Sequence, residues 1–212
     1  MNKNIITKNN FDYDWINNNT VHHKYLIKSI ENILSIENTS NFEHLDIGCG
    51  NGLLTSKISK FFKSSTGIDL SGTGIEQAIK LNNERLKFEN TSIEEIIYRK
   101  KKFKFITSFE VIEHQYLPDN FLNQISEILE DDGILLISTP YHGYIKNLII
   151  NILGKHDFHY NPLWRHGHIK FFSIKTLTSL LIKCNFKILK QKFSGRFYPI
   201  SNSMIFLVKK NI

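Results

Sequence analysis

Residues 44–52 read HLDIGCGNG, and residues 67–71 read GIDLS. The first stretch is typical of an apolar strand that ends in a glycine-rich turn, and the second is typical of a strand that ends on an acid, Asp69. Glycine lets the backbone turn sharply and lie against a ligand with no Cβ in between. An acid about 20 residues further on can accept hydrogen bonds from both hydroxyls of a ribose. Together the two stretches predict a doubly wound α/β domain that holds an adenosine.

Strands and helices alternate along the first two thirds of the chain. The apolar spacing predicts strands at 44–47, 66–69, 86–88, 103–109 and 133–138. It predicts helices at 21–36, 53–62, 74–81, 92–98 and 117–129. This alternation indicates a parallel sheet with helices on both faces. The tail differs, because a helix at 175–182 precedes two strands, at 186–193 and 204–209, which we expect to pair antiparallel at the sheet edge.

These elements predict one domain of 212 residues. We expect it to comprise an N-terminal helical arm (1–40), a cofactor-binding core (41–140), an insert (141–170), and a C-terminal helix with the antiparallel strands (171–212). A segment as long as the insert is usually functional within a compact domain, for example as a lid.

Composition limits the possible partners of the protein and its location in the cell. The net charge is +7, which permits an anionic partner, but the excess is scattered except in the run RKKKFK at 99–104. A solvated surface is therefore the plainer interpretation. Cys49 and Cys184 form neither a disulfide framework nor a zinc pattern. The polar start MNKNIITKNN is unlike a targeting signal, and no apolar run is long enough to span a membrane. These features predict a cytoplasmic protein.

LDIGCGNG resembles the first motif of the class I S-adenosylmethionine-dependent methyltransferases, and GIDLS resembles their second. Residues 88–96, FENTSIEEI, are similar to the third motif. The antiparallel strand pair is that family's addition to the Rossmann plan. The resemblance covers residue 42 to the end of the chain. It implies a Rossmann-like, doubly wound seven-stranded sheet, mostly parallel, and S-adenosylmethionine as the methyl donor.

The resemblance also implies a cofactor site. Gly48 and Gly50 would let the methionine part approach closely, and Asp46 would hold its ammonium group through charge and water. Asp69 would take the ribose hydroxyls. Phe109 is either a cofactor contact or a core aromatic. The full implied set is Asp46, Gly48, Cys49, Gly50, Asp69, Leu70, Ser92, Ile93 and Phe109, in which the Ser92 side chain and the Ile93 amide would read the adenine edge.

The fourth predicted strand ends in FEVIEH, 109–114. Glu110, Glu113 and His114 stand at i, i+3 and i+4, which places them on one side of a helical turn. Two carboxylates and an imidazole at a strand end suit a divalent metal with open positions. Further on, WRHGHIKFFS (164–173) carries His166 and His168, and either could return over the site. In the plainer interpretations, the acid and histidine work without a metal, or Glu113 and His114 cap the next helix.

EVIEH followed by a histidine before KFF resembles two subgroups, the ubiquinone-pathway O-methyltransferases and the small-RNA 2′-O-methyltransferases. The second holds a metal through two glutamates and two histidines. By position, the implied catalytic residues and metal ligands are Glu110, Glu113, His114 and His168, with His166 in reserve and Mg or Zn as the metal. Such a metal would lower the pKa of a bound hydroxyl, whose oxygen would then attack the sulfonium methyl in line. Without a metal, His114 is the expected general base.

The expected reaction is O-methylation of a small molecule, with a catechol-like ring, a sugar or a lipid-linked compound as the acceptor. The alternatives are RNA 2′-O-methylation, N- or C-methylation with His114 as base, and a non-catalytic scaffold. Nucleic acid is the weaker expectation, because we find no platform of interleaved basic and aromatic residues on which bases would stack. Neither subgroup's insert resembles residues 141–162 closely, so the substrate cannot be inferred from the resemblance.

The insert has an apolar stripe with Lys146 and Lys155 near its ends; the stripe comprises Leu148, Ile149, Ile152 and Leu153. It predicts either a helix packed across the site entrance or a surface, 144–153, that meets a membrane or a lipid-tailed substrate. Two further groups complete the expectations. Surface or hydrogen-bonded positions are expected for His142, His156 and His159, and a place in the substrate pocket for Tyr141, Tyr144, Trp164 and Arg165. Arg165 would suit a carboxylate or phosphate. Trp15 and Tyr25 either close the cofactor pocket or belong to the core.

Overall fold

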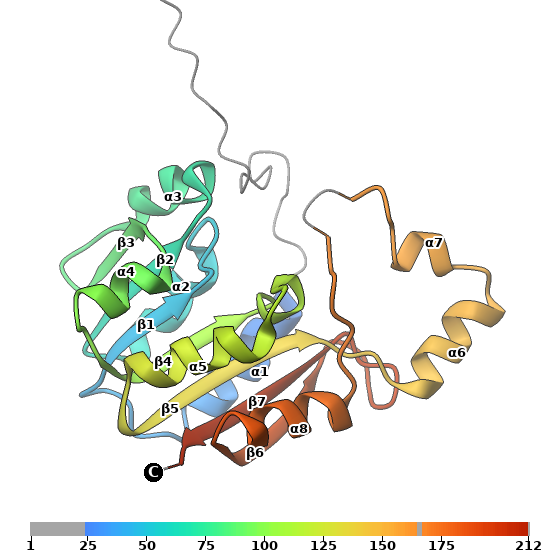
Figure 1. The fold of residues 1–212 in the computed structure, drawn as a ribbon. Helices are drawn as coiled ribbons and strands as arrows, with labels where there is room; N and C mark the ends of the chain where they lie inside the picture. Colours follow the sequence, from blue (N-terminus) through green and yellow to red (C-terminus); the bar gives the residue numbers. More distant parts are fainter. Residues whose placement is uncertain (1–23, 165–166, 212) are drawn as a thin grey trace, which may run out of the picture.

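A computed structural model describes residues 24–164 and 167–211, and one seven-stranded sheet forms its centre (Figure 1). The strand order is β3-β2-β1-β4-β5-β7-β6. The strands are β1 (Glu43–Ile47), β2 (Ser64–Asp69), β3 (Leu86–Asn90), β4 (Phe103–Phe109), β5 (Leu129–Pro140), β6 (Phe186–Ser194) and β7 (Ser203–Lys210). Neighbours from β3 to β5 pair in parallel, whereas β7 runs antiparallel to both β5 and β6. The predicted Rossmann-like sheet with its antiparallel C-terminal pair is confirmed.

Helices cover both faces of the sheet. They are α1 (Lys24–Leu34), α2 (Leu53–Ile58), α3 (Gly72–Ala78), α4 (Ile93–Tyr98), α5 (Pro118–Ile128), α6 (Tyr144–Ile152), α7 (His156–His159) and α8 (Ile174–Lys183). Short 3₁₀ turns are η2 (Ser59–Phe61), η3 (Ile79–Leu81) and η4 (Ile112–His114). Figure 1 shows α4, α5 and α8 on one face, with α1 and α2 on the other. The predicted helices at 53–62 and 74–81 are each shorter than expected, because their last turns tighten into η2 and η3.

The core consists of one apolar layer on each face of the sheet. Side chains alternate between the faces of a strand, so Phe105 on β4 packs with α1 and α2, whereas its neighbour Ile106 packs with α5 and α8. Four of the seven residues of β4 have apolar side chains, and all but one of its residues are buried, as expected for a central parallel strand covered on both sides. This rigid sheet fixes where the carboxyl ends of β1 to β5 lie.

The insert behaves differently from the core. Helices α6 and α7 project away from the sheet between β5 and α8 (Figure 1), and no residue of α6 is buried. The apolar stripe predicted there is solvent-exposed, with 73% of Ile152 and 59% of Leu153 accessible. Within residues 24–164 and 167–211, no helix is both long enough and apolar enough to cross a membrane.

Candidate active site

A cleft of about 1220 Å³ runs along the carboxyl ends of β1 to β5, the edge at which doubly wound sheets bind ligands. The predicted cofactor residues line it, all except Gly50. Glu110, His114 and His168 line it as well. Residues of the insert, among them Lys146 and Trp164, complete its wall. The structure therefore brings most of the predicted cofactor and catalytic positions to one cavity.

The glycine turn after β1 is tied to the end of β2 by backbone hydrogen bonds. The amides of Gly48 and Cys49 donate to the carbonyl of Ile68, at 2.9 and 3.1 Å. Gly48 has a φ of +77°, and a Cβ there would run into the side chain of Val111. Because a left-handed conformation and a close neighbour coincide, only glycine fits this position without strain.

Asp69 is held by the same turn. Its carboxylate accepts hydrogen bonds from the amides of Gly50 (2.7 Å) and Ser71 (2.8 Å). Burial raises the pKa of Asp69, and the two amide donors act in the opposite direction. Each carboxylate oxygen has a second lone pair, so Asp69 can accept further donors from the cleft.

Asp46 is fixed by two threonines inside the sheet. Thr55 Oγ1 donates to it at 2.5 Å and Thr107 Oγ1 at 2.6 Å, while burial raises its pKa to about 6. His44 Nε2 lies 2.8 Å from Thr107 Oγ1, and its Nδ1 lies 3.0 Å from Ser65 Oγ. Since Thr107 gives its one proton to Asp46, His44 Nε2 must be the donor to Thr107. Burial lowers the pKa of His44 to about 3, so the ring is neutral.

This chain from His44 to Asp46 was not found by sequence reasoning. The signal available was a histidine within the predicted strand 44–47, and its partners are 21 and 63 residues away. The residues predicted to contact the adenine also have structural roles. The hydroxyl of Ser92 accepts from the amide of Glu95 and caps α4. Phe109 packs in the core with α1 and α2, as one of the two interpretations expected, and it also lines the cleft.

The turn after β4 departs from the predicted single helical turn. Glu110 has a φ of +56°, and only residues 112–114 form the 3₁₀ turn η4. The carboxylate of Glu110 accepts from Ser138 Oγ (2.7 Å) and Ser203 Oγ (3.1 Å), and burial raises its pKa to about 7. The expected helical i, i+3, i+4 spacing is wrong, because the left-handed backbone of Glu110 lies outside the turn and its carboxylate binds residues of β5 and β7. Among the described residues, Glu110 does not join the candidate metal-ligand group below.

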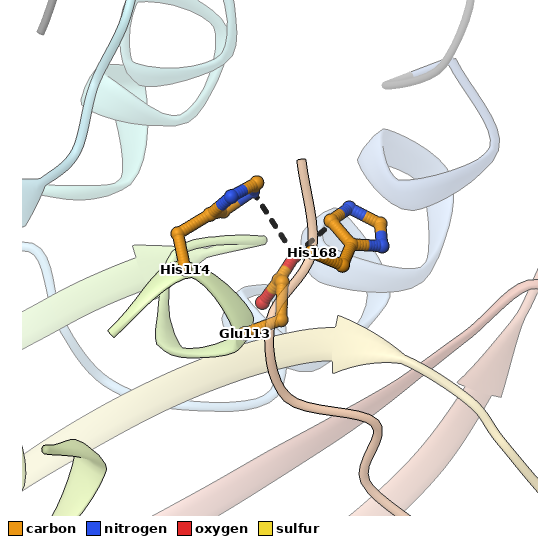
Figure 2. Close-up of side chains that lie close together, drawn as sticks. All are labelled: Glu113, His114 and His168. Atoms are coloured by element: carbon orange, nitrogen blue, oxygen red, sulfur yellow. Dashed lines mark ion pairs between the residues drawn. The ribbon is translucent and has the colours of Figure 1, made fainter. Parts of the chain in front are cut away.

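Glu113, His114 and His168 converge (Figure 2). One potential ligand atom from each lies within 4.8 Å of the others. Glu113 Oε1 is 4.0 Å from His114 Nε2 and 3.9 Å from His168 Nε2. These three donor atoms form a group that could hold a metal ion.

Long-range contacts assemble this Glu113–His114–His168 group. The backbone carbonyl of Glu113 accepts from the amides of Ile169 and Lys170, both at 3.0 Å, and this brings the end of the insert back over η4. Thr139 Oγ1 donates to Glu113 Oε2 at 2.9 Å. Within the part of the chain that the structure describes, Glu113 Oε1 is buried and has no hydrogen-bond partner. Burial, with Glu110 nearby, raises the pKa of Glu113.

Each of the two imidazoles contributes a ring nitrogen to this group. His114 Nδ1 is 3.2 Å from the carbonyl of Gly167, so Nδ1 is the donor of that hydrogen bond and Nε2 is the nitrogen that faces Glu113. Burial, with His114 nearby, lowers the pKa of His168 to about 4, which keeps it neutral. The helix-cap interpretation of Glu113 and His114 is wrong, because α5 begins after Leu117, which forms its N-cap without a side-chain hydrogen bond.

Other expectations for the insert are met only in part. Trp164 lines the cleft, but Tyr141 packs on Phe193 and Tyr144 is 78% exposed, so neither tyrosine is a pocket residue. His142 is buried between Phe171 and Tyr160, and its Nδ1 lies 3.4 Å from the hydroxyl of Tyr160, so it meets the expectation of a hydrogen-bonded position. His156 and His159 are exposed, as expected.

Two N-terminal expectations have different outcomes. Tyr25 lines the cleft, and its hydroxyl lies 3.1 Å from Ser203 Oγ. Trp15, Arg165 and His166 lie outside the described residues.

A sheet in this order, with a glycine turn after β1 and an acid at the end of β2, defines a class I S-adenosylmethionine-dependent methyltransferase. The chain belongs to the methyltransferase-domain family, whose model matches residues 20–191. It is 31% identical over 182 residues to the ubiquinone biosynthesis O-methyltransferase of Pelagibacter ubique, covering 84% of this chain and 75% of that one. The mitochondrial enzyme of that name from Schizosaccharomyces pombe is 31% identical over 147 residues, and the match spans 53% of its length.

Solved structures agree on the fold. An S-adenosylmethionine-dependent methyltransferase from Clostridium acetobutylicum superposes with a TM-score of 0.68 at 16% identity, covering 88% of this chain and 91% of that one. Magnesium protoporphyrin IX methyltransferase from Synechocystis, with S-adenosylhomocysteine bound, gives 0.66 at 12% identity, covering 88% and 84%. The protein is an S-adenosylmethionine-dependent methyltransferase, and the family implies a methyl acceptor as its second substrate.

Proposed function

We propose that the protein methylates a hydroxyl of a small molecule that carries two adjacent hydroxyls, with the help of a divalent metal. The observation that carries this proposal is the buried Oε1 of Glu113, which has no hydrogen-bond partner within the described residues and faces the imidazoles of His114 and His168 beside the cleft. A buried acceptor without a partner is costly unless a ligand satisfies it. Further support comes from relatives named as O-methyltransferases.

The nine implied cofactor residues keep their proposed roles. Asp69, aligned by two backbone amides, would accept the ribose hydroxyls, and the glycine turn would receive the methionine part. Asp46 would act on the ammonium group from within the sheet. S-Adenosylmethionine supplies an electrophilic methyl when it is bound. The residues of the turn would hold that methyl group in line with the acceptor oxygen.

For the metal, the proposed ligands are Glu113, His114 and His168, without Glu110. When bound, Mg or Zn would lower the pKa of an acceptor hydroxyl. The chain's own residues orient this set, since Thr139 fixes one oxygen of Glu113 and the Gly167 carbonyl fixes the tautomer of His114. His114 Nε2 would serve as the proton acceptor if no metal takes part.

As a second proposal, residues 144–153 contact either an apolar tail on the acceptor or a membrane surface. It is supported by exposed apolar side chains on and after α6, namely Ile152, Leu153, Phe158 and Leu163. Ile149, Leu153 and Phe158 also line the cleft, so the apolar surface continues toward the cofactor end. Vesicle flotation of the protein, with and without Ile152→Ser/Leu153→Ser, tests this proposal.

The main proposal is tested by calorimetry of Mg²⁺, Zn²⁺ and S-adenosylhomocysteine on the wild type and on Glu113→Ala/His168→Ala. Metal binding is expected to vanish in the double variant while S-adenosylhomocysteine affinity stays within about twofold. Glu127→Ala/His156→Ala, which removes an exposed acid and an exposed histidine, is the matched control. Unchanged methylation of catechol by the active-site double variant would overturn the proposal.

A further inference from the structure

The cleft has a basic part formed by Lys146 on α6 and Arg196 in the loop between β6 and β7. Both side chains line the cleft together with Glu110, His114 and His168. The charges of Lys146 and Arg196 influence each other, and Lys146 also acts on His168. The two cations therefore lie near one another and within electrostatic reach of the Glu113–His114–His168 group.

Lys146 is held in place by neutral groups. Its Nζ donates to the backbone carbonyls of Tyr141 (2.7 Å) and Asn202 (3.4 Å). An ammonium has three donors, so two carbonyls leave one for a ligand. The carbonyls fix the direction of the side chain without neutralising its charge.

Neither cation forms a direct ion pair with an acid of the described residues. Across residues 24–164 and 167–211, the ion pairs within 4.0 Å leave out both Lys146 and Arg196. Glu110 is the acid whose charge acts on Lys146, and its carboxylate is bound by Ser138 and Ser203 instead. Burial lowers the pKa of Lys146 to about 8, which is the cost of partly desolvating a cation. An anionic ligand would offset that cost.

We propose that Lys146 and Arg196 form a subsite for an acidic group, a carboxylate or a phosphate, on the methyl acceptor. This inference rests on the proposed O-methylation and narrows its substrate class to anionic compounds with adjacent hydroxyls. Lysine contributes a point charge and arginine a planar fork of donors, both suited to carboxylate and phosphate oxygens. The acidic group would bind at the basic part of the cleft while the hydroxyls face Glu113 and the two histidines.

The first test measures binding without turnover. Protein saturated with S-adenosylhomocysteine is titrated with 3,4-dihydroxybenzoate and with catechol, which differ by one carboxylate. The wild type is expected to bind the acid about tenfold more tightly, the scale of a hydrogen bond to a charged group. Lys146→Ala and Arg196→Gln should each reduce this preference to below about threefold, whereas Lys146→Arg should keep most of it. Lys57→Ala, an exposed lysine on α2, is the control and should match the wild type.

Two further arms separate the possible sources of the anion. Benzoate and phenyl phosphate compete with 3,4-dihydroxybenzoate, and the tighter competitor identifies carboxylate or phosphate as the preferred group. The affinity for S-adenosylhomocysteine is measured on every variant. If Lys146→Ala and Arg196→Gln weaken that affinity instead, the two cations bind the cofactor's carboxylate and the inference is overturned. Equal binding of catechol and its acid by the wild type would overturn it too.

Failure of this inference can be told apart from failure of the proposed function. Charge-selective binding without methylation of any dihydroxylated compound would leave the subsite standing and reject O-methylation. If catechol and 3,4-dihydroxybenzoate bind with equal affinity and both are methylated, the subsite is rejected and O-methylation stands. Arg196 is exposed, so Arg196→Gln provides a folded variant even if Lys146→Ala detaches α6 from Tyr141 and Asn202.

Discussion

Asp69 and Glu113 are both partly or fully buried carboxylates at the same edge of the sheet, yet their surroundings differ. Both oxygens of Asp69 accept hydrogen bonds from backbone amides of the adjoining turns. Glu113 has one oxygen bound by Thr139 and, within the described part of the chain, the other unpartnered. In the proposed assignment, the cofactor end of the cleft lies at Asp69 and is hydrogen-bonded before any ligand arrives, whereas the acceptor end lies at Glu113 and keeps one carboxylate oxygen available. We infer that the site for the common cofactor is preformed and that the site for the acceptor is completed by its own ligand.

The largest effect is expected from Glu113→Gln, which keeps the shape of the side chain and replaces the proposed carboxylate ligand by an amide. Turnover should fall about 100-fold, the upper end of the range for residues that hold a metal site in place. Steady-state methylation of a dihydroxylated acceptor measures it. Glu127→Gln is the control, since that acid is exposed on α5. Turnover within threefold of the wild type would mean that the open acceptor end has no catalytic role.

Thr139→Val should have a smaller effect, because Thr139 acts through Glu113. The variant removes the hydroxyl that fixes Glu113 Oε2 at 2.9 Å. We expect about a tenfold fall in kcat or in metal affinity, as for other partners of ligating carboxylates. Thr139→Ser should restore most of it. If the serine variant behaves like the valine variant, Thr139 contributes packing and not orientation.

The smallest effect is expected on the pH dependence of stability, and it comes from the buried His44. His44 has a pKa of about 3 in the folded protein and about 6.5 when unfolded. Between these values the unfolded chain binds one more proton, so stability falls as the pH drops below 6.5. From pH 7 to pH 5 this amounts to about 2 kcal/mol.

Urea unfolding of the wild type and His44→Gln at both pH values measures this term. The variant should lose less stability on acidification by that amount, with exposed His156→Ala as the control. Equal pH dependence in His44→Gln and the wild type would show that His44 is not neutral in the folded state.

The difference between the surroundings of Asp69 and those of Glu113 also explains which features could be predicted from the sequence. The glycine turn, Asp69 and the alternation of strands and helices are local signals, and they were sufficient for the sheet and for the residues that line the cofactor end. Glu110 shows the limit of such signals. Its left-handed backbone and its bonds to Ser138 and Ser203, 28 and 93 residues away, depend on where β5 and β7 lie. An i, i+3, i+4 spacing contains no information about those strands.

Lys146 illustrates the same limit within the insert. The sequence shows a lysine near the start of an apolar stripe, which is typical of a solvated helix end. Its inward position follows from the carbonyls of Tyr141 and Asn202, which become neighbours only when β7 returns beside β5. Sequence reasoning therefore located the acceptor end of the cleft without its basic part.

The most direct test of the division into a complete cofactor end and an open acceptor end is the S-adenosylhomocysteine affinity of Asp69→Ala and Glu113→Ala, measured side by side by calorimetry. We predict that Asp69→Ala binds at least about tenfold more weakly, because charged hydrogen bonds to the ribose are lost. Glu113→Ala should bind within twofold of the wild type. Equal weakening in both variants, or loss in Glu113→Ala alone, would contradict the division.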